Sequence, residues 1–286
     1  MPTEPPKRKR RWYQFSLRSL LVFMVVAALA FSWLLRRVEK KRQEREAVEA
    51  IVKLGGNASY DYQNAAGAKA PGPGWLRMVL GENFFSQVIS VYFYGNATVN
   101  DDGLKFLKEL PEIQFLGLND TNVGDAGLVN LKGLLNVQQL YLGGTNLTDS
   151  GLANLKDLNQ LQILYVLKTH ITDAGLKQLK ELKQLQELDL RYNHITGAGL
   201  ADLKGLSSLQ KLELGATGLG DEGLANLKDL TGLIALDLTQ TKITDAGLVH
   251  LKGLTKLRNL WLQETNVSDA GVNDLQKALP SCKIER

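Results

Sequence analysis

Cysteine is almost absent from the sequence: Cys282 is the only one among 286 residues. An intrachain disulfide is therefore impossible, and a zinc site built on cysteines is excluded. Histidine is also scarce, with three residues. The sequence shows no Ser-His-Asp or Cys-His grouping, no phosphate-binding loop and no His/Glu motif with metal-ligand spacing. We therefore predict that the chain is not an enzyme and that it uses no cofactor and no metal.

Most of the chain carries no excess of positive charge, although the net charge of the whole chain is +4. Residues 1–45 hold twelve of the 34 basic residues and three of the 30 acidic ones, a net charge of +9. The remaining residues carry 22 basic and 27 acidic side chains, a net charge of −5. The basicity is thus confined to the N-terminal region, and we expect no nucleic-acid partner.

One long run lacks charge altogether, the seventeen residues from Ser19 to Leu35. As a helix this run is about 26 Å long, slightly less than the ~30 Å hydrocarbon core of a bilayer. Extension back to Phe15 gives about 31 Å, with Arg18 able to reach the headgroups. Aromatic residues that suit the membrane interface stand near both ends: Trp12, Tyr13 and Trp33. We predict a transmembrane helix over residues 15–35, after a basic tail of residues 1–14.

The segment can be an uncleaved signal-anchor or a cleaved signal peptide. Ala28-Leu29-Ala30 resembles a cleavage site, but the following FSWLL continues the apolar run, which favours the anchor. Six basic residues precede the span and six follow it, so the count of positive charges does not decide the orientation. The basic clusters also suit contact with anionic lipid. We expect a single-pass membrane protein whose C-terminal domain is extracytoplasmic.

Residues 36–90 are predicted to form a charged juxtamembrane helix and an N-terminal cap. The helix should end at Gly55-Gly56. WLRMVLG (75–81) indicates a short helix, and the β-branched and aromatic VISVYFY (88–94) indicates a strand.

The rest of the chain repeats itself with a period of 24 residues. Glycines recur at this spacing at Gly103, Gly127, Gly151, Gly175, Gly199, Gly223, Gly247 and Gly271. Such a period is typical of a solenoid, in which each unit buries its apolar face against the next. In the unit LQILYVLKTHITDAGLKQLKELK (161–183), Leu164 and Val166 alternate as in a short buried strand. Leu176, Leu179 and Leu182 have the spacing of a buried helical stripe.

The residues before that helix predict an N-terminal cap for its first turn. Thr172 is placed to cap the first turn, while Asp173 and Lys180 complement the two ends of the helix dipole.

The pattern L-x-x-L-x-V-x-x-T-x-I, followed by T-D-A-G-L, resembles the leucine-rich repeat, in its bacterial and F-box-associated subclass. The resemblance begins near residue 88, and residues 91–286 hold about eight repeats. It implies an α/β horseshoe solenoid with a parallel sheet on the concave face, helices on the convex face and, usually, a protein ligand. Two features depart from the family. Asn193 keeps the usual Asn, but Thr stands at the equivalent position in six other repeats (Thr121, Thr145, Thr169, Thr217, Thr241 and Thr265), and Gly197 replaces an Asp. No F-box-like adaptor segment is recognisable.

Residues that flank the core leucines of each strand are expected on the concave face. One column contains Gly117, Tyr141, Tyr165, Asp189, Glu213, Asp237 and Trp261, and its neighbour contains Asn119, Gly143, Leu167, Arg191, Gly215, Thr239 and Gln263. Since adjacent strands lie about 4.8 Å apart, neighbours in a column touch. We predict a protein- or peptide-binding face with an aromatic patch (Tyr141, Tyr165, Leu167, Tyr192), an acidic run (Asp189, Glu213, Asp237) beside Arg191, and Trp261 at the far end. A generic solvated surface is the alternative.

Two other columns are interpreted as structural. His170 and His194 occupy equivalent positions one repeat apart, but no third metal ligand accompanies them. A lysine recurs in seven repeats, and an aspartate recurs at the opposite helix end.

The sequence thus predicts a membrane-anchored binding or scaffold module. Three other functions stay open. The chain can be a soluble exported protein after cleavage at Ala30, a structural envelope protein that self-associates, or, least favoured, a hydrolase of cell-wall polymers. The sequence does not indicate an oligomeric state.

Overall fold

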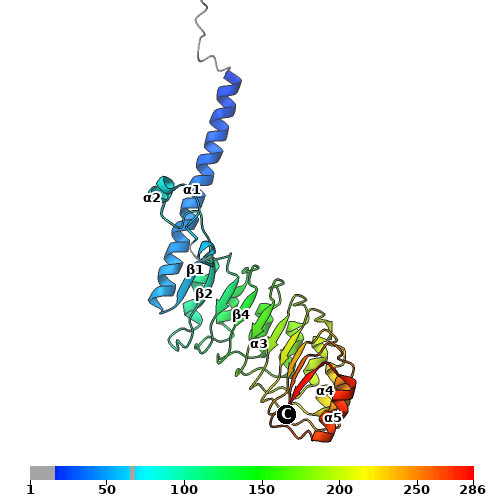
Figure 1. Cartoon of the computed structure of the whole chain (residues 1–286). Coiled ribbons are helices and arrows are strands. Elements are labelled where there is room, and N and C mark those ends of the chain that lie inside the picture. Colours follow the sequence, from blue (N-terminus) through cyan, green and yellow to red (C-terminus); the bar gives the residue numbers. More distant parts are fainter. Residues whose placement is uncertain (1–16, 65–67) are drawn as a thin grey trace, which may run out of the picture. The chain divides into compact units, whose positions relative to one another are not determined.

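The computed structural model describes residues 17–64 and 68–286 (Figure 1). The predicted basic tail and the first two residues of the predicted span lie outside the described residues. The chain divides into two compact units, Met1–Gln43 and Glu44–Arg286.

A single long helix, α1, runs from Leu17 to Lys53. Its N-terminal part is long and apolar enough to cross a membrane, and none of that stretch is buried. A signal sequence has the same length and composition. The helix ends as predicted, because Gly55 has a φ of +74°, a conformation that glycine adopts without steric cost.

The N-terminal cap follows α1. It contains β1 (Asn57–Tyr60), the 3₁₀ turn η1 (Asp61–Asn64), α2 (Gly74–Leu80) and β2 (Val88–Tyr92). The predicted short helix and strand are thus confirmed within two residues at their ends. Strand β1 was not predicted; it pairs antiparallel with β2 and so covers the first edge of the sheet.

One ten-stranded sheet runs through the repeats in sequence order, β1 to β10, and all pairs after the first are parallel. The strands of the repeats have three residues each: β3 Phe115–Gly117, β4 Gln139–Tyr141, β5 Ile163–Tyr165, β6 Glu187–Asp189, β7 Lys211–Glu213, β8 Ala235–Asp237, β9 Asn259–Trp261 and β10 Lys283–Glu285.

Short helices return the chain from each strand to the next. Most are 3₁₀ helices: η2 Asp101–Glu109, η3 Gly127–Leu131, η4 Ala153–Leu155, η5 Asp173–Leu179, η6 Ala198–Gly205, η7 Ala225–Leu227 and η8 Gly247–Leu251. The α-helices are α3 Asp149–Leu152, α4 Asp221–Leu224 and the longer, terminal α5 Asp269–Ala278.

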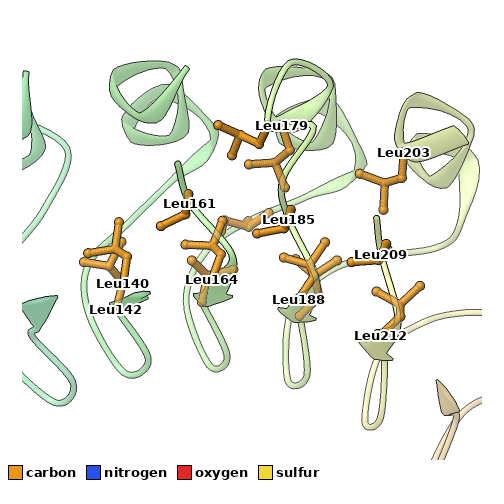
Figure 2. Packing of buried hydrophobic residues seen from close by; sticks show 14 of the residues in the cluster. Leu140, Leu142, Leu161, Leu164, Leu179, Leu185, Leu188, Leu203, Leu209 and Leu212 are labelled. Atoms are coloured by element: carbon orange, nitrogen blue, oxygen red, sulfur yellow. The ribbon is translucent and has the colours of Figure 1, made fainter. Parts of the chain in front are cut away.

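The core is a stack of leucine layers between the strands and these helices (Figure 2). In one repeat, Leu164 and Val166 on the strand side and Leu176, Leu179 and Leu182 on the helix side are fully buried, as predicted. The parallel sheet thus lies on one side of the leucine core and the short helices lie on the other (Figure 2).

Candidate interaction face

The strands present two columns of side chains on the side of the sheet that faces away from the leucine core, here called the sheet face. The middle residue of each strand from β3 to β9 is buried, so alternation sends both flanking residues outward. The parallel register holds equivalent residues side by side, as at Leu164 and Leu188. The second flanking residues form the predicted column. The first flanking residues form a column that was not predicted: Phe115, Gln139, Ile163, Glu187, Lys211, Ala235 and Asn259.

Aromatic side chains gather over the first strands of the sheet face. The ring centroids of Phe115 and Tyr141 lie 5.1 Å apart, and those of Tyr141 and Tyr165 lie 5.0 Å apart, edge to face. Tyr94 covers Gly117, where any Cβ would meet the Tyr94 ring at 2.9 Å. These four rings (Tyr94, Phe115, Tyr141, Tyr165) are called the aromatic cluster. Such ring contacts, tilted for Phe115–Tyr141 and edge to face for Tyr141–Tyr165, fix the rings and leave their remaining surface available to a ligand.

Leu167, another predicted site residue, lies over Gly143 in the next column. A Cβ at Gly143 would meet Leu167 Cδ2 at 2.5 Å, so the glycine makes room for the leucine.

A network of ion pairs, the charged cluster, follows the aromatic cluster along the sheet. Arg191 donates from Nε to Asp189 Oδ1 at 3.0 Å and from Nη2 to Asp189 Oδ2 at 2.7 Å. The same Nη2 lies 2.8 Å from Glu213 Oε2, and Lys211 Nζ lies 2.5 Å from Glu213 Oε1. Asp189 is fully buried, which makes its negative charge costly to desolvate. The guanidinium offsets this cost because it pairs with both carboxylate oxygens.

Tyr165 joins the two clusters. Its hydroxyl donates to Glu187 Oε2 at 2.9 Å, and Lys211 Nζ lies 5.9 Å from the centre of its ring. Burial and the Glu187 carboxylate raise the pKa of Tyr165 to about 12. The phenol therefore stays neutral at physiological pH.

The pKa values of the ionic groups are shifted by the same surroundings. Burial, helped by the charge of Asp189, raises the pKa of Glu213 against the opposing influence of Lys211. The hydrogen bonds to Asp189 raise the pKa of Arg191. Burial alone would lower the pKa of Lys211, but its contact with Glu213 and the other nearby carboxylates raises it. Both cations are thus held in their charged forms.

A hollow of about 270 Å³ opens beside the charged cluster, lined by Arg191, Tyr192, Gly215, Ala216, Asp237, Thr239 and Gln240. Asp237 Oδ1 accepts a hydrogen bond from the Thr239 amide at 2.9 Å. A Cβ at Gly215 would lie 2.9 Å from Asp237 Oδ2, so the glycine leaves space for this carboxylate.

Tyr192 lines this hollow and does not join the aromatic cluster, where the sequence had placed it. Its backbone has a φ of +55°, which belongs to the tight turn after β6. Trp261, on β9, is half-buried near the opposite end of the sheet from the aromatic cluster.

Comparison with known proteins identifies this architecture. The family described as leucine rich repeat matches residues 159–219. Internalin C2 of Listeria monocytogenes aligns with a TM-score of 0.56 and 26% identity, over 69% of this chain and 80% of the other. The chain has the fold of a leucine-rich-repeat solenoid.

Other comparisons add to the fold and not to the function. A leucine-rich-repeat protein of Leptospira interrogans aligns with a TM-score of 0.53 and 22% identity, over 64% of this chain and 45% of the other. No curated protein sequence matches the chain. Since 434 chains of solved structures match, the leucine-rich-repeat fold by itself does not select a ligand.

The recurrent aspartates of the solenoid connect one repeat to the next. Asp149 accepts from the backbone amide of Thr172 at 2.8 Å and from its hydroxyl at 2.6 Å. Asp125, Asp221 and Asp245 make the same pair of bonds to the capping residue one repeat later. From the sequence, these aspartates were predicted only to complement the helix dipole, whereas their direct contacts are inter-repeat hydrogen bonds.

The threonines that replace the family's usual Asn make hydrogen bonds within their loops. Thr145 Oγ1, for example, donates to the Leu142 carbonyl at 2.6 Å within the loop. The capping role of Thr172 is also confirmed, because its hydroxyl accepts from the Ala174 amide at 3.2 Å. Asn193, the asparagine at the equivalent position, makes hydrogen bonds to the preceding repeat. Its side-chain carbonyl accepts from Thr169 Oγ1 and the Ile171 amide, while its amide nitrogen donates to the Val166 carbonyl.

The aspartate-to-cap hydrogen bonds are missing between one pair of repeats, where Gly197 replaces the aspartate and Gly220 replaces the capping threonine. A hollow of about 630 Å³ lies at this place, lined by Thr196, Ala198, Gly218, Gly220, Asp221, Glu222, Gly223 and Asn226. Gly197 has a φ of +111°, and a Cβ there would lie 2.4 Å from the Gly223 Cα. Close backbone contact thus takes the place of the two aspartate hydrogen bonds, while Asn226 Nδ2 donates to the Gly197 carbonyl at 2.9 Å.

The histidine and lysine columns lie in the loops and on the helical side. His170 and His194 are exposed, and the described residues contain no group of three His, Cys, Asp or Glu side chains that could hold a metal. Lys252 pairs with Asp274 at 2.7 Å on the surface.

Proposed function

We propose that the chain is a membrane-anchored, non-enzymatic leucine-rich-repeat module that binds a protein or peptide through its sheet face. The observation that carries this proposal is the position of the aromatic cluster directly beside the charged cluster on one sheet. Tyrosine, tryptophan and arginine on a rigid surface are the usual anchors of protein interfaces. Since ring contacts and ion pairs already hold these side chains, binding costs little further ordering.

Charge on this face indicates what the partner contributes. Glu187, Asp189, Glu213 and Asp237 outnumber Arg191 and Lys211 by two. A partner with basic residues flanked by apolar ones would match both clusters.

The proposed anchor is the N-terminal part of α1, with the repeats extracytoplasmic. One feature of the sequence supports an anchor that is not cleaved. The apolar run continues as FSWLL directly after Ala28-Leu29-Ala30, whereas the residues that follow a cleavage site are usually more polar. Retention at the membrane suits a module that displays a binding surface.

A topology experiment tests the anchor. The full chain carries a C-terminal tag, the membrane fraction is washed with alkali, and intact cells are treated with protease. We expect the tag to stay with the membrane and to be cut from outside. A tag of reduced mass in the soluble fraction would show a cleaved, exported protein, and a membrane-bound but protected tag would place the repeats in the cytoplasm.

A crosslinking experiment tests the sheet face. A photoreactive amino acid replaces Tyr165 or Trp261 on the sheet face, or, as matched controls, Val129 or Val249, which are exposed on η3 and η8. We expect one adduct of defined mass from the two sheet-face positions and none from the controls. Equal adducts from both sides would contradict a sheet-face site. An adduct of twice the chain mass would favour self-association.

A further inference from the structure

Helix α2 of the cap exposes its most apolar side. Trp75, Met78 and Val79 are 69%, 88% and 75% exposed. Their spacing of three and four residues places them on one face of the helix. Arg77, in contrast, is turned inward, with a side chain that is only 19% exposed. This is the reverse of the orientation that water favours for a short surface helix.

The inward position of Arg77 has an electrostatic cost that the outward apolar face does not offset in water. Its Nη1 donates to the Ala70 carbonyl, and Nη1 lies 3.6 Å from Glu82 Oε1. Its Nε is buried and has no hydrogen-bond partner among the residues that the structure describes. A buried donor without a partner disfavours this arrangement unless the exposed face is itself covered by something apolar.

The position of α2 in the chain points to the membrane surface as that cover. Gly81 ends α2 next to Arg45 of α1: a Cβ at Gly81 would lie 3.1 Å from Arg45 Nη2. Arg45 is ten residues beyond Leu35, where the uncharged run ends, which corresponds to about 15 Å of helix. The contact with Arg45 therefore joins α2 to the basic segment that directly follows the uncharged run.

Charge and residue type agree with this location. Residues 36–45 carry six basic and two acidic side chains, a net charge of +4 that attracts anionic lipid. Tryptophan is the side chain most typical of the bilayer interface, and methionine and valine add apolar surface beside it.

We propose that α2 is a second membrane contact, in which Trp75, Met78 and Val79 insert into the headgroup boundary of an anionic bilayer. This inference rests on the membrane anchor of the proposed function. It adds that the repeat domain is attached at two points, which restricts its rotation about α1.

Fluorescence quenching in vesicles tests the inference and the anchor separately. The full chain is reconstituted into vesicles of phosphatidylcholine and phosphatidylglycerol with brominated acyl chains, which quench only a tryptophan in contact with lipid. Three variants each keep one tryptophan (Trp33, Trp75 or Trp261), and phenylalanine replaces the others. We expect Trp75 to lose most of its emission and to be blue-shifted, and Trp261 to be unaffected.

Each result has one meaning. Quenching of Trp75 supports the second contact, whatever Trp33 does, whereas an unquenched Trp75 overturns it. Quenching of Trp33 reports on the anchor alone. A blue shift of Trp75 without quenching would show that protein covers α2, and would also overturn the inference.

A charge substitution gives an independent check with a matched control. In the variant that keeps only Trp75, Met78→Glu should restore most of the lost emission, because a carboxylate is repelled by the anionic surface. Val249→Glu, at an exposed apolar side chain on η8, should leave the quenching unchanged. Equal quenching with and without Met78→Glu would contradict insertion of this face.

Discussion

The pairing of Arg191 with the buried Asp189 is the most consequential ionic contact of the sheet face. Arg191→Met keeps an unbranched apolar stem and removes the guanidinium charge. It would leave a fully buried carboxylate without a cation, close to Glu213. Loss of one partner of a buried pair costs about 3–5 kcal/mol. We expect the lower end, about 3 kcal/mol, because the Arg191 side chain is 35% exposed and solvent weakens its interaction.

The double variant Asp189→Asn/Arg191→Met separates charge from packing. Asparagine can still accept the bond that Asp189 Oδ1 receives from the Arg191 backbone amide, but it carries no charge. It should therefore recover about 1–2 kcal/mol of the loss. Urea unfolding of the full chain in detergent, monitored by circular dichroism, measures both values. The comparison requires that the dependence of the free energy of unfolding on urea concentration is the same in all variants.

The dependence on pH gives a second signature. Burial already holds the pKa of Glu213 above 4.5 in the folded protein, and removal of the guanidinium would raise it further. A raised folded-state pKa means that stability is lost as pH rises through it, so the deficit of Arg191→Met should shrink as pH falls towards 4.5. A single variant as stable as the wild type, or a double variant that is less stable than the single one, would refute this reasoning.

Three further predictions concern the backbone, the loop ladder and the tyrosine. Gly197→Ala should cost about 1–3 kcal/mol because of the positive φ and the close contact with the next repeat, whereas Gly253→Ala, where a Cβ meets nothing within 4 Å, should be neutral in the same urea assay. Burial opposes the charge of Asp173, but hydrogen bonds from Thr196, Gly197 and Gly199 outweigh it and lower the pKa of this carboxyl. The stability that Asp173 contributes should therefore be lost as pH falls below 3.8, and this part of the acid dependence should be absent in Asp173→Asn. In spectrophotometric titration, Tyr165→Phe should remove only absorbance that develops near pH 12, and a loss near pH 10 would contradict the bond to Glu187.

The repeat and its register could be predicted from the sequence because they depend on periodicity. Leucines 24 residues apart must occupy equivalent positions in successive repeats, and this periodicity identifies the strand residues that face the core. The column that includes Phe115 and Lys211 follows from the same alternation; it was missed because only the residues after each core leucine were considered. Strand β1 was missed for another reason, since NASY is short and carries no apolar alternation.

Contacts between loops could not be predicted in this way. The aspartates bond to residues 23 positions later, and nothing in a linear pattern distinguishes such a contact from a helix-dipole role. The position of Tyr192 depends on a turn with positive φ that recurs in other repeats, as at Lys168 and Ala216, and the sequence pattern does not reveal this φ. The inward rotation of Arg77 likewise depends on how the cap packs, and not on the composition of α2.

The departures from the repeat consensus coincide with the candidate site. The repeat that begins with β6 contains Asp189, Arg191 and Tyr192, and it also contains the exceptional Asn193 and Gly197. Asn193 and Asp173 bind this repeat tightly to the one before it, through both side-chain and backbone groups. Gly197 then removes the usual connection to the repeat after it. Deviations from a locally consistent pattern are expected where function constrains a sequence more than stability does. The deviations therefore support a ligand site centred on this repeat, with Arg191 and Tyr192 at the edge of the hollow beside Asp237.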